Sequence, residues 1–498
     1  MSNIRVTYSG LIAFVIGITT VITGLVFILI VTRSLTPDEF GTWSLIGTMI
    51  GYFLISERII SFWTTRQVAR NEEVGKTSIL SSTTFSAGAI PLYVAVVFLL
   101  TQQNNADFEI MVFGLILIPV FFVSETLHGI NLGHKPQATS YGLLGFELLK
   151  IPTALAFVYF LDLGVIGAII ALTIAYLLRI VIQLYFARKK IGGKSSFQAL
   201  RRWLKLGWIP SYSNIAKFLK STDVVVYTVI TGSVLGLAYY AVGSTLAKII
   251  HHSDNISKAL YPKLIATGDY NHIQETFSLQ MYFAIPLLGI TVIFAKPAMF
   301  ALNPLYIDVY IIAIILSFRM FFAEWNGFFG KILQGIDTVD VEQNPNFRKL
   351  LKSKIFLVFT IKNVHSGLQL GIVIIVLLIL TSYGFSELEL VTWWTIVSLS
   401  LEIPFVIFLW FYVKKFTNFS FPYTNIGKYI GVTLAFMGVF VVMSDTLIEY
   451  NISIYDFLPG VILQLLICIG LYLLVTFLID KKTRLLFKSI IAELASKK

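Results

Sequence analysis

Apolar stretches long enough to cross a membrane follow one another along nearly the whole sequence, with short polar gaps between them. A helix needs about 20 apolar residues to span the hydrocarbon core of a bilayer. The runs are continuous rather than alternating in polarity, which favours membrane-spanning helices over a β-barrel. The sequence therefore predicts fourteen spans within 498 residues. They cover about residues 8–32, 42–63, 78–100, 110–128, 142–161, 164–187, 205–230, 236–260, 275–296, 306–326, 353–380, 389–412, 427–446 and 458–479.

Basic residues between the runs fall almost entirely in alternate gaps. Cytoplasmic loops of membrane proteins are the ones enriched in Lys and Arg. The gaps on the opposite side contain only Arg33, with Lys296 at the edge of a span. The pattern predicts a multi-pass protein of the cell membrane with both termini in the cytoplasm. It also accounts for the net charge of +11 as a topology signal, so we expect no nucleic-acid partner.

Composition and motifs argue against catalysis. Charged residues make up 13% of the chain, against about 25% in soluble domains. No stretch is long enough for a separate soluble domain, and the first run is interpreted as a retained span rather than a cleaved signal. The single cysteine, Cys468, allows neither an internal disulfide nor a thiolate metal site. Phosphate-cradling loops, paired catalytic carboxylates and nucleophile elbows are absent from the sequence, which predicts a protein that is not an enzyme and needs no cofactor.

A long basic loop after the sixth span suggests two bundles. We expect an N-terminal six-helix bundle over 1–187, a cytoplasmic linker over 188–204 and a second six-helix bundle over 205–413. Two further helices and a basic tail would follow over 414–498. A weak internal repeat, in which 43–48 resembles 239–244, agrees with two halves of the same orientation.

Polar side chains concentrate in the seventh and eighth predicted spans. Ionisable residues inside a membrane usually face a bundle interior or a water-filled cavity. We therefore expect these residues to line a cavity, with a purely structural polar seam as the alternative. In the seventh span they are Tyr212, Asn214, Lys217, Lys220 and Asp223, and in the eighth they are Tyr240, Ser244, Lys248, His251, His252, Asn255 and Lys258, on one side of an α-helix.

The charge of this set is mainly positive, which favours an anionic substrate such as a phosphate or diphosphate head group. In the second span, Arg58 either points into the same cavity or pairs with its neighbour Glu57. Lys150 and Glu147 are three residues apart and are expected to neutralise each other. The adjacent His251 and His252 are not predicted to bind metal, because lysines surround them and no thiolate is near. Proton sensing by these histidines is an alternative.

Several motifs resemble the oligosaccharide and polysaccharide flippase branch of the multidrug/oligosaccharidyl-lipid/polysaccharide (MOP) exporter superfamily. One is TRSLTPDEFG at 32–41, the turn between the first two spans. Another is DLGVIGA at 162–168, a tight turn between the fifth and sixth spans. The third comprises DVVV at 223–226, AYYA at 238–241 and ALYP at 259–262. The order of these motifs, together with the span count, extends the resemblance over most of the chain.

The resemblance implies two six-helix bundles in a V with two additional helices, and alternating access around a cavity lined by spans one, two, seven and eight. It also implies a working monomer that moves a lipid-linked oligosaccharide. The cations that would hold its phosphate are, by position, Arg58, Lys217, Lys220, Lys248 and Lys258. The segment 382–387 departs from the family pattern, which leaves the packing of spans eleven and twelve open.

The sequence thus predicts a flippase that carries a polyprenyl phosphate- or diphosphate-linked oligosaccharide to the outer leaflet, for surface polysaccharide or glycoprotein assembly. Tyr212, Asn214 and Tyr240 are the candidate sugar contacts. Membrane lipids and glycan-assembly enzymes are the expected partner classes. The alternative is a sodium- or proton-coupled multidrug exporter on the same scaffold, although residues 8–32 lack the acidic residue such exporters commonly use. A membrane-embedded glycosyltransferase would need a larger outer loop than this chain has.

Overall fold

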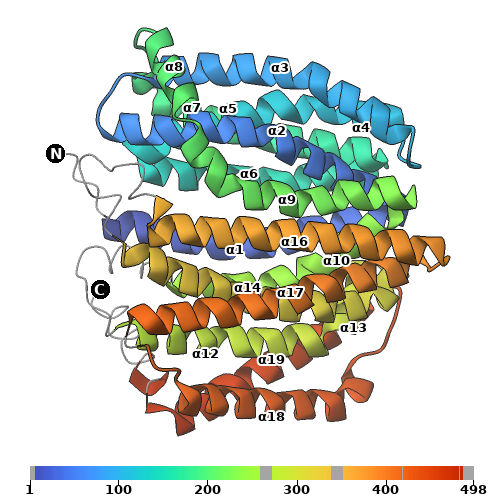
Figure 1. Cartoon of the computed structure of the whole chain (residues 1–498). Helices are drawn as coiled ribbons and strands as arrows, with labels where there is room; N and C mark the ends of the chain where they lie inside the picture. Colours follow the sequence, from blue (N-terminus) through green and yellow to red (C-terminus); the bar gives the residue numbers. More distant parts are fainter. Residues whose placement is uncertain (1–5, 258–271, 338–350, 418, 482, 486–498) are drawn as a thin grey trace. The chain divides into compact units, whose positions relative to one another are not determined.

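The computed structural model describes residues 6–257, 272–337, 351–417, 419–481 and 483–485 (Figure 1). Within these ranges the chain forms helices and no strand, which confirms the predicted all-α polytopic fold. The helices are α1 (Val6–Ser34), α2 (Pro37–Ala69), α3 (Gly75–Thr101), α4 (Phe108–Phe113), η1 (Gly114–Ile116), α5 (Leu117–His134), α6 (Pro136–Ala154), η2 (Leu155–Phe160), α7 (Gly164–Ile191), α8 (Phe197–Lys205), α9 (Trp208–Thr231), α10 (Leu235–Ala247), η3 (Lys248–Ser257), α12 (His272–Ile293), α13 (Ala295–Leu302), η4 (Pro304–Val309), α14 (Tyr310–Gly335), α16 (Lys354–Ser382), α17 (Glu387–Phe416), α18 (Tyr423–Leu447) and α19 (Ile454–Ile479).

Eleven helical segments of the described chain are long and apolar enough to cross a membrane. The three predicted spans outside this set are the first, seventh and eighth. In the first, the described apolar stretch is Ile22–Ser34. The seventh corresponds to α9, whose charged and polar side chains lower its hydropathy. The eighth is divided between α10 and η3. The seventh and eighth predicted spans, which depart from a simple apolar helix, are therefore those in which the sequence concentrates its polar residues.

The chain divides into two compact units. The first comprises Met1–Tyr239 with Ser366–Leu390, and the second comprises Tyr240–His365 with Val391–Lys498. Because the divisions fall inside α10, α16 and α17, each of these helices contributes residues to both units. The sequence-based boundaries at 187, 204 and 413 remain predictions.

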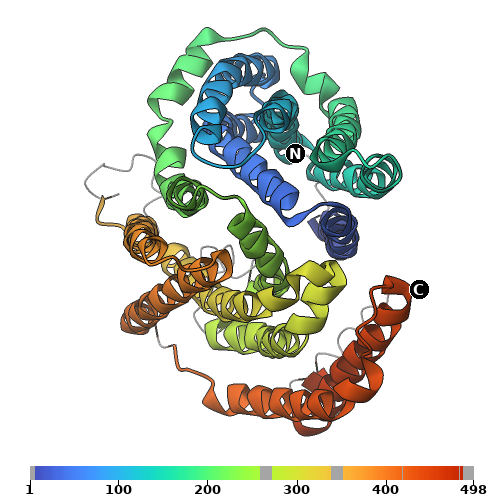
Figure 2. The same cartoon turned by 90° about the vertical axis from the view of Figure 1, so that its right-hand side faces the viewer.

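In the first unit α2 packs against α5 and α9, while α6 packs against α1 and α7. The tight turn predicted between the fifth and sixth spans is present, with Asp162 and Gly164 both at positive φ (49° and 54°). Only a few residue types tolerate this left-handed conformation. Figure 2 shows the green segment between α7 and α9, which includes α8, passing along the edge of the blue and cyan helices of the same unit.

The motif at 32–41 has a clear local function in this unit. Thr36 caps α2 in a capping box with Glu39, and Pro37 occupies the first helical turn. At Gly41 a Cβ atom would lie 2.1 Å from the carbonyl oxygen of Val234, so only glycine permits this approach of the chain to α2. The motif therefore fixes both the start of α2 and its packing.

The second unit has an extensive apolar core. α12 packs against α14 and α18, and α18 packs against α19. Phe277, on α12, contacts Trp325, Phe328 and Phe329 of α14 with ring centroids 5.0–5.8 Å apart. Cys468 is fully buried in the same core. Aromatic stacking and apolar packing thus anchor the two C-terminal helices to α12.

Candidate functional site

Arg58 and Glu57, adjacent on α2, point to different helices. The Nη1 atom of Arg58 donates to Oδ1 of Asn214 on α9 at 2.8 Å. Glu57 is almost fully buried and accepts a hydrogen bond from the hydroxyl of Thr126 on α5 at 3.0 Å. Arg58 therefore contacts α9 rather than pairing with Glu57, and Asn214 holds its guanidinium group in place.

Lys217 lies three residues after Asn214 on the same side of α9. Its side chain is exposed, and its ammonium group is within electrostatic range of Arg58. Among the side chains that the structure describes, no carboxylate lies within ion-pair distance of either cation. Two neighbouring like charges repel each other, so an anion that contacted both would relieve this repulsion. We name Arg58, Asn214 and Lys217 the cationic cluster.

Elsewhere on α9, Tyr212 and Lys220 are half-buried and Asp223 is buried. The amide nitrogen of Gln369, from the α16 segment of the same unit, lies 3.4 Å from Oδ2 of Asp223. Gln369 did not emerge from the sequence as a site residue. The sequence feature that could have identified Gln369 is an amide side chain inside a long apolar run, because a buried amide needs polar partners.

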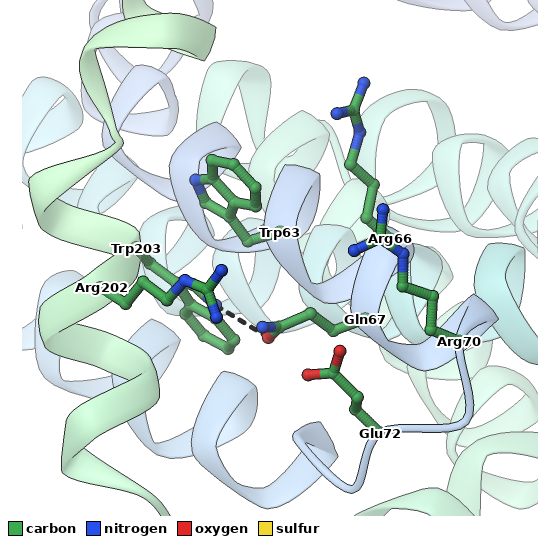
Figure 3. A pocket seen from close by; sticks show the side chains of 7 residues that line it. All are labelled: Trp63, Arg66, Gln67, Arg70, Glu72, Arg202 and Trp203. Atoms are coloured by element: carbon green, nitrogen blue, oxygen red, sulfur yellow. Dashed lines mark hydrogen bonds between the residues drawn. The ribbon is translucent and has the colours of Figure 1, made fainter. Parts of the chain in front are cut away.

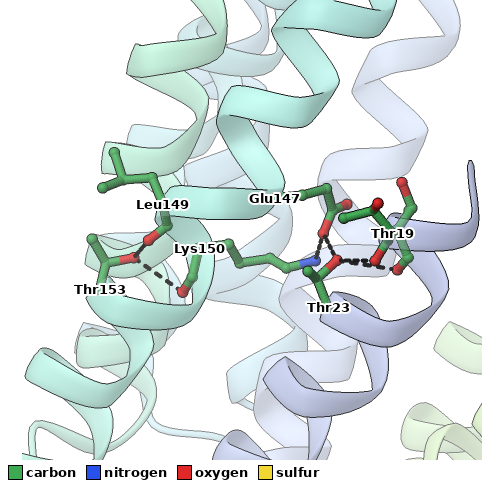
Figure 4. A network of polar contacts seen from close by, with 7 residues as sticks. Thr19, Thr23, Glu147, Leu149, Lys150 and Thr153 are labelled. Atoms are coloured by element: carbon green, nitrogen blue, oxygen red, sulfur yellow. Dashed lines mark hydrogen bonds and ion pairs between the residues drawn. The ribbon is translucent and has the colours of Figure 1, made fainter. Parts of the chain in front are cut away.

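Another predicted feature of the first unit forms as expected (Figure 4). Nζ of Lys150 lies 2.5 Å from Oε2 of Glu147, and both side chains are buried within the bundle. The hydroxyl of Thr23 on α1 donates to the same carboxylate oxygen. The ammonium also faces the rings of Phe27 and Phe146 at 5.4 and 5.2 Å. We name Thr23, Glu147 and Lys150 the buried pair network, which joins α1 to α6.

In the second unit the geometry of the predicted polar stripe differs from expectation. The α-helix ends at Ala247, and Lys248–Ser257 forms a 3-10 helix, so the α-helical register predicted over 236–260 is confirmed as far as Ala247 and was wrong for 248–257. Ser253, Asp254 and Asn255 favour this change because their side chains compete for backbone hydrogen bonds. With three residues per turn, positions three apart align. Lys258 lies outside the described residues.

Polar side chains of η3, including that of Ser257, contact α14. Nδ1 of His251 lies 2.7 Å from Oε1 of Glu324. Nζ of Lys331 lies 2.5 Å from Oδ1 of Asp254. Because Glu324 and Lys331 are seven residues apart, they lie on the same side of α14. This part of the stripe therefore binds one helix to another.

The remaining candidates of the second unit are divided between packing and exposure. The hydroxyl of Tyr240 accepts from Arg319 at 3.0 Å, and its ring stacks on Trp394 with centroids 4.3 Å apart. Ser244 donates to a backbone carbonyl of its own helix. Three candidates have exposed side chains, namely Lys248, His252 and Asn255. Within the described ranges, no three His, Cys, Asp or Glu side chains gather as metal ligands do.

Comparisons with known proteins support the fold. No protein-family model and no curated relative matches the sequence. The structure is similar to that of the lipid II flippase MurJ in an inward closed conformation, with a TM-score of 0.71 and 13% identity over 95% of this chain and 99% of that one. It is also similar to an inward-facing multidrug resistance MATE family transporter of the MOP superfamily, with a TM-score of 0.58 and 14% identity over 80% of this chain and 95% of that one. The chain therefore has the fold of MOP-superfamily transporters.

Proposed function

We propose that this protein is a flippase that moves a lipid-linked oligosaccharide from the inner to the outer leaflet by alternating access. The observation that carries the proposal is the cationic cluster, in which Arg58 binds Asn214 and Lys217 lies about one helical turn further along α9, with no carboxylate of the described side chains in ion-pair contact with either cation. The likeness to a lipid II flippase over nearly the whole chain supports the same class of cargo.

The chemistry of the cluster suits a phosphate or diphosphate. The guanidinium of Arg58 presents a planar set of donors, whereas Lys217 supplies a flexible point charge. Asn214 fixes the guanidinium from one side. An anionic head group would neutralise both cations, while the polyprenyl tail would stay in lipid. Lys220, Lys248 and Lys258 are proposed as further phosphate contacts on the resemblance alone.

Several finer features belong to this proposal. They are the two six-helix bundles with two extra helices, the cytoplasmic location of both termini and a working monomer. The polysaccharide branch of the superfamily is proposed in the same way. The second candidate function is a multidrug exporter, which the likeness to a multidrug resistance transporter favours. Cationic drugs would, however, be repelled by the cationic cluster.

A deletion strain provides the test. We expect complete polyprenol-linked oligosaccharide to accumulate in its cytoplasmic leaflet, as measured by leaflet-selective labelling and mass spectrometry. The intact gene should relieve the accumulation, whereas Arg58→Gln and Lys217→Ala should not. The charge-preserving variant Lys217→Arg and the exposed loop variant Lys189→Ala are the matched controls.

The outcomes separate the two candidate functions. Normal glycan output from both cluster variants, at unchanged protein levels, would refute the role of the cluster. Unchanged glycolipids with increased drug sensitivity in the deletion strain would instead identify a multidrug exporter.

A further inference from the structure

A small pocket lies where α2 ends and α8 crosses it, within the first unit (Figure 3). Its volume is about 60 Å³, which is room for about four water-sized groups. The lining residues are Trp63, Arg66, Gln67, Arg70, Glu72, Arg202 and Trp203. None of them belongs to the cationic cluster, so the pocket is a separate feature of the unit.

Two buried residues give the pocket a fixed wall. Nε1 of Trp203 donates to Oε1 of Gln67 at 2.8 Å, and both side chains are buried. An indole nitrogen can only donate, so the amide oxygen of Gln67 must face it. The amide nitrogen is then available as a donor. Trp203 also packs on Ile60, Val68 and Val74, which holds α8 against α2.

Positive charge dominates the rest of the lining. Arg66 and Arg70 are one helical turn apart at the end of α2, and Arg202 faces them from α8. Glu72 is the single acidic residue of the lining. Within the described part of the chain, none of these four side chains forms an ion pair. The lining thus combines three guanidinium groups with one carboxylate, a net charge of +2 by formal count (3 − 1).

We propose that this pocket binds the phosphate group of an anionic ligand. Guanidinium groups bind phosphate oxygens through paired hydrogen bonds, and Arg70 and Arg202 line the space, while the guanidinium of Arg66 lies over the ring of Phe62. The amide nitrogen of Gln67 adds a neutral donor from the buried wall. The proposal concerns a site distinct from transport and stands whether or not the protein is a flippase.

Two sources can supply this chemistry, a lipid head group and a soluble phosphate. The exposed side chains of Phe197 and Leu204 lie on one side of α8, seven residues apart, in the helix that also carries Arg202. Apolar side chains beside basic ones are typical of helices that lie in a membrane interface. The basic gaps at 64–77 and 188–204 also belong to the side of the membrane predicted to be cytoplasmic.

The test uses the full chain in nanodiscs of phosphatidylcholine, with three additions made separately. These are phosphatidylglycerol, inorganic phosphate in the buffer, and oleate as an anion without phosphate. Lipids retained by the protein are counted by native mass spectrometry, and the thermal unfolding midpoint is recorded in each arm. The variant Arg70→Gln/Arg202→Gln is compared with Lys189→Gln/Lys194→Gln, which removes the same charge from exposed positions nearby.

We expect phosphatidylglycerol to bind and stabilise the intact protein, with affinity reduced about tenfold or more in the arginine variant and unchanged in the lysine variant. The same pattern with inorganic phosphate alone would support the site and identify a soluble ligand. The Arg202→Lys variant should bind the phosphate ligand with intermediate affinity, because lysine keeps the positive charge but lacks the planar guanidinium donors that make paired hydrogen bonds. The proposal would be overturned if oleate bound as tightly as phosphatidylglycerol. It would also be overturned if the two double variants showed the same ligand binding and the same unfolding midpoint with each of the three additions.

Discussion

Two polar groups of the first unit use similar residues in opposite ways. In the buried pair network, Lys150 and Glu147 neutralise each other and Thr23 donates to the same carboxylate. In the cationic cluster, Arg58 and Lys217 carry the same sign of charge, and Lys217 is exposed. A charge neutralised one turn away on its own helix serves packing, whereas two like charges without a carboxylate partner among the described side chains fit the anion-binding role proposed for the cluster. Substitutions in the buried pair network and in the cationic cluster test this difference.

The largest effect is expected from breaking the buried pair. Glu147→Ala leaves the ammonium of Lys150 buried and unpaired, which should cost about 3–5 kcal/mol of stability. The double variant Glu147→Met/Lys150→Met removes both charges and should recover much of that loss. Thermal unfolding of the purified protein measures both variants. A single variant as stable as the double would show that the pair does not neutralise a buried charge.

Charge reversal in the cationic cluster should separate stability from transport. Lys217→Glu places a carboxylate near Arg58 and creates an exposed ion pair, which changes stability by about 0–1 kcal/mol in the favourable direction. Transport of the lipid-linked cargo should nevertheless fall roughly 10- to 100-fold, because an anionic head group loses a charge-assisted contact and meets repulsion. Glycan output and the unfolding midpoint are measured on the same strain. If glycan output and the unfolding midpoint fell together, the cationic cluster would have a structural role and not a role in transport.

The contact between η3 and α14 extends the comparison to the second unit. Lys331→Ala leaves Asp254 without its ion-pair partner, but both side chains are partly exposed, at 23% and 13%. The stability cost should therefore be about 1 kcal/mol, well below that of Glu147→Ala. Unfolding midpoints of the two variants, recorded side by side, test this ranking. An equal or larger loss for Lys331→Ala would mean that burial does not set the difference.

The smallest effect is expected at Asn214, which positions Arg58 without contributing charge. Asn214→Ala removes the hydrogen bond to Arg58, worth about 0.5–1.5 kcal/mol, and should lower transport roughly threefold to tenfold. Asn214→Asp should be more harmful, since a carboxylate at this position neutralises Arg58. The measurement is the transport rate of each variant. Normal transport by Asn214→Asp would contradict the proposal that Arg58 must stay without a carboxylate partner.

The sequence predicted those features that depend on local pattern. Span length and polarity predicted the helical fold, the three-residue spacing predicted the pair of Lys150 and Glu147, and the glycine-containing segment predicted the turn at Asp162 and Gly164. Contacts between distant segments were not predicted. The hydrogen bond from Arg58 to Asn214 joins residues 156 positions apart, and that between Gln67 and Trp203 joins residues 136 apart. Periodicity carries no information about such pairs.

The polar stripe of the eighth predicted span shows a different limit. Its residues were assigned to one side of an α-helix, since hydropathy alone does not distinguish helix types. Once the turn tightens, Lys248, His251 and Asp254 align instead, and two of them contact α14. The placement of Lys248, His252 and Asn255 at exposed positions leaves their proposed roles to experiment.

The ten residues of η3 also form a longer segment than the same residues would in an α-helix. A 3-10 helix rises about 2.0 Å per residue and an α-helix about 1.5 Å, so this segment spans about 5 Å more than its α-helical form would. Rewinding it to α geometry would draw Ser257 toward α10 by nearly one helical pitch, with no change in covalent structure. The contacts of His251, Asp254 and Ser257 with α14 are among the interactions that such a movement would have to break.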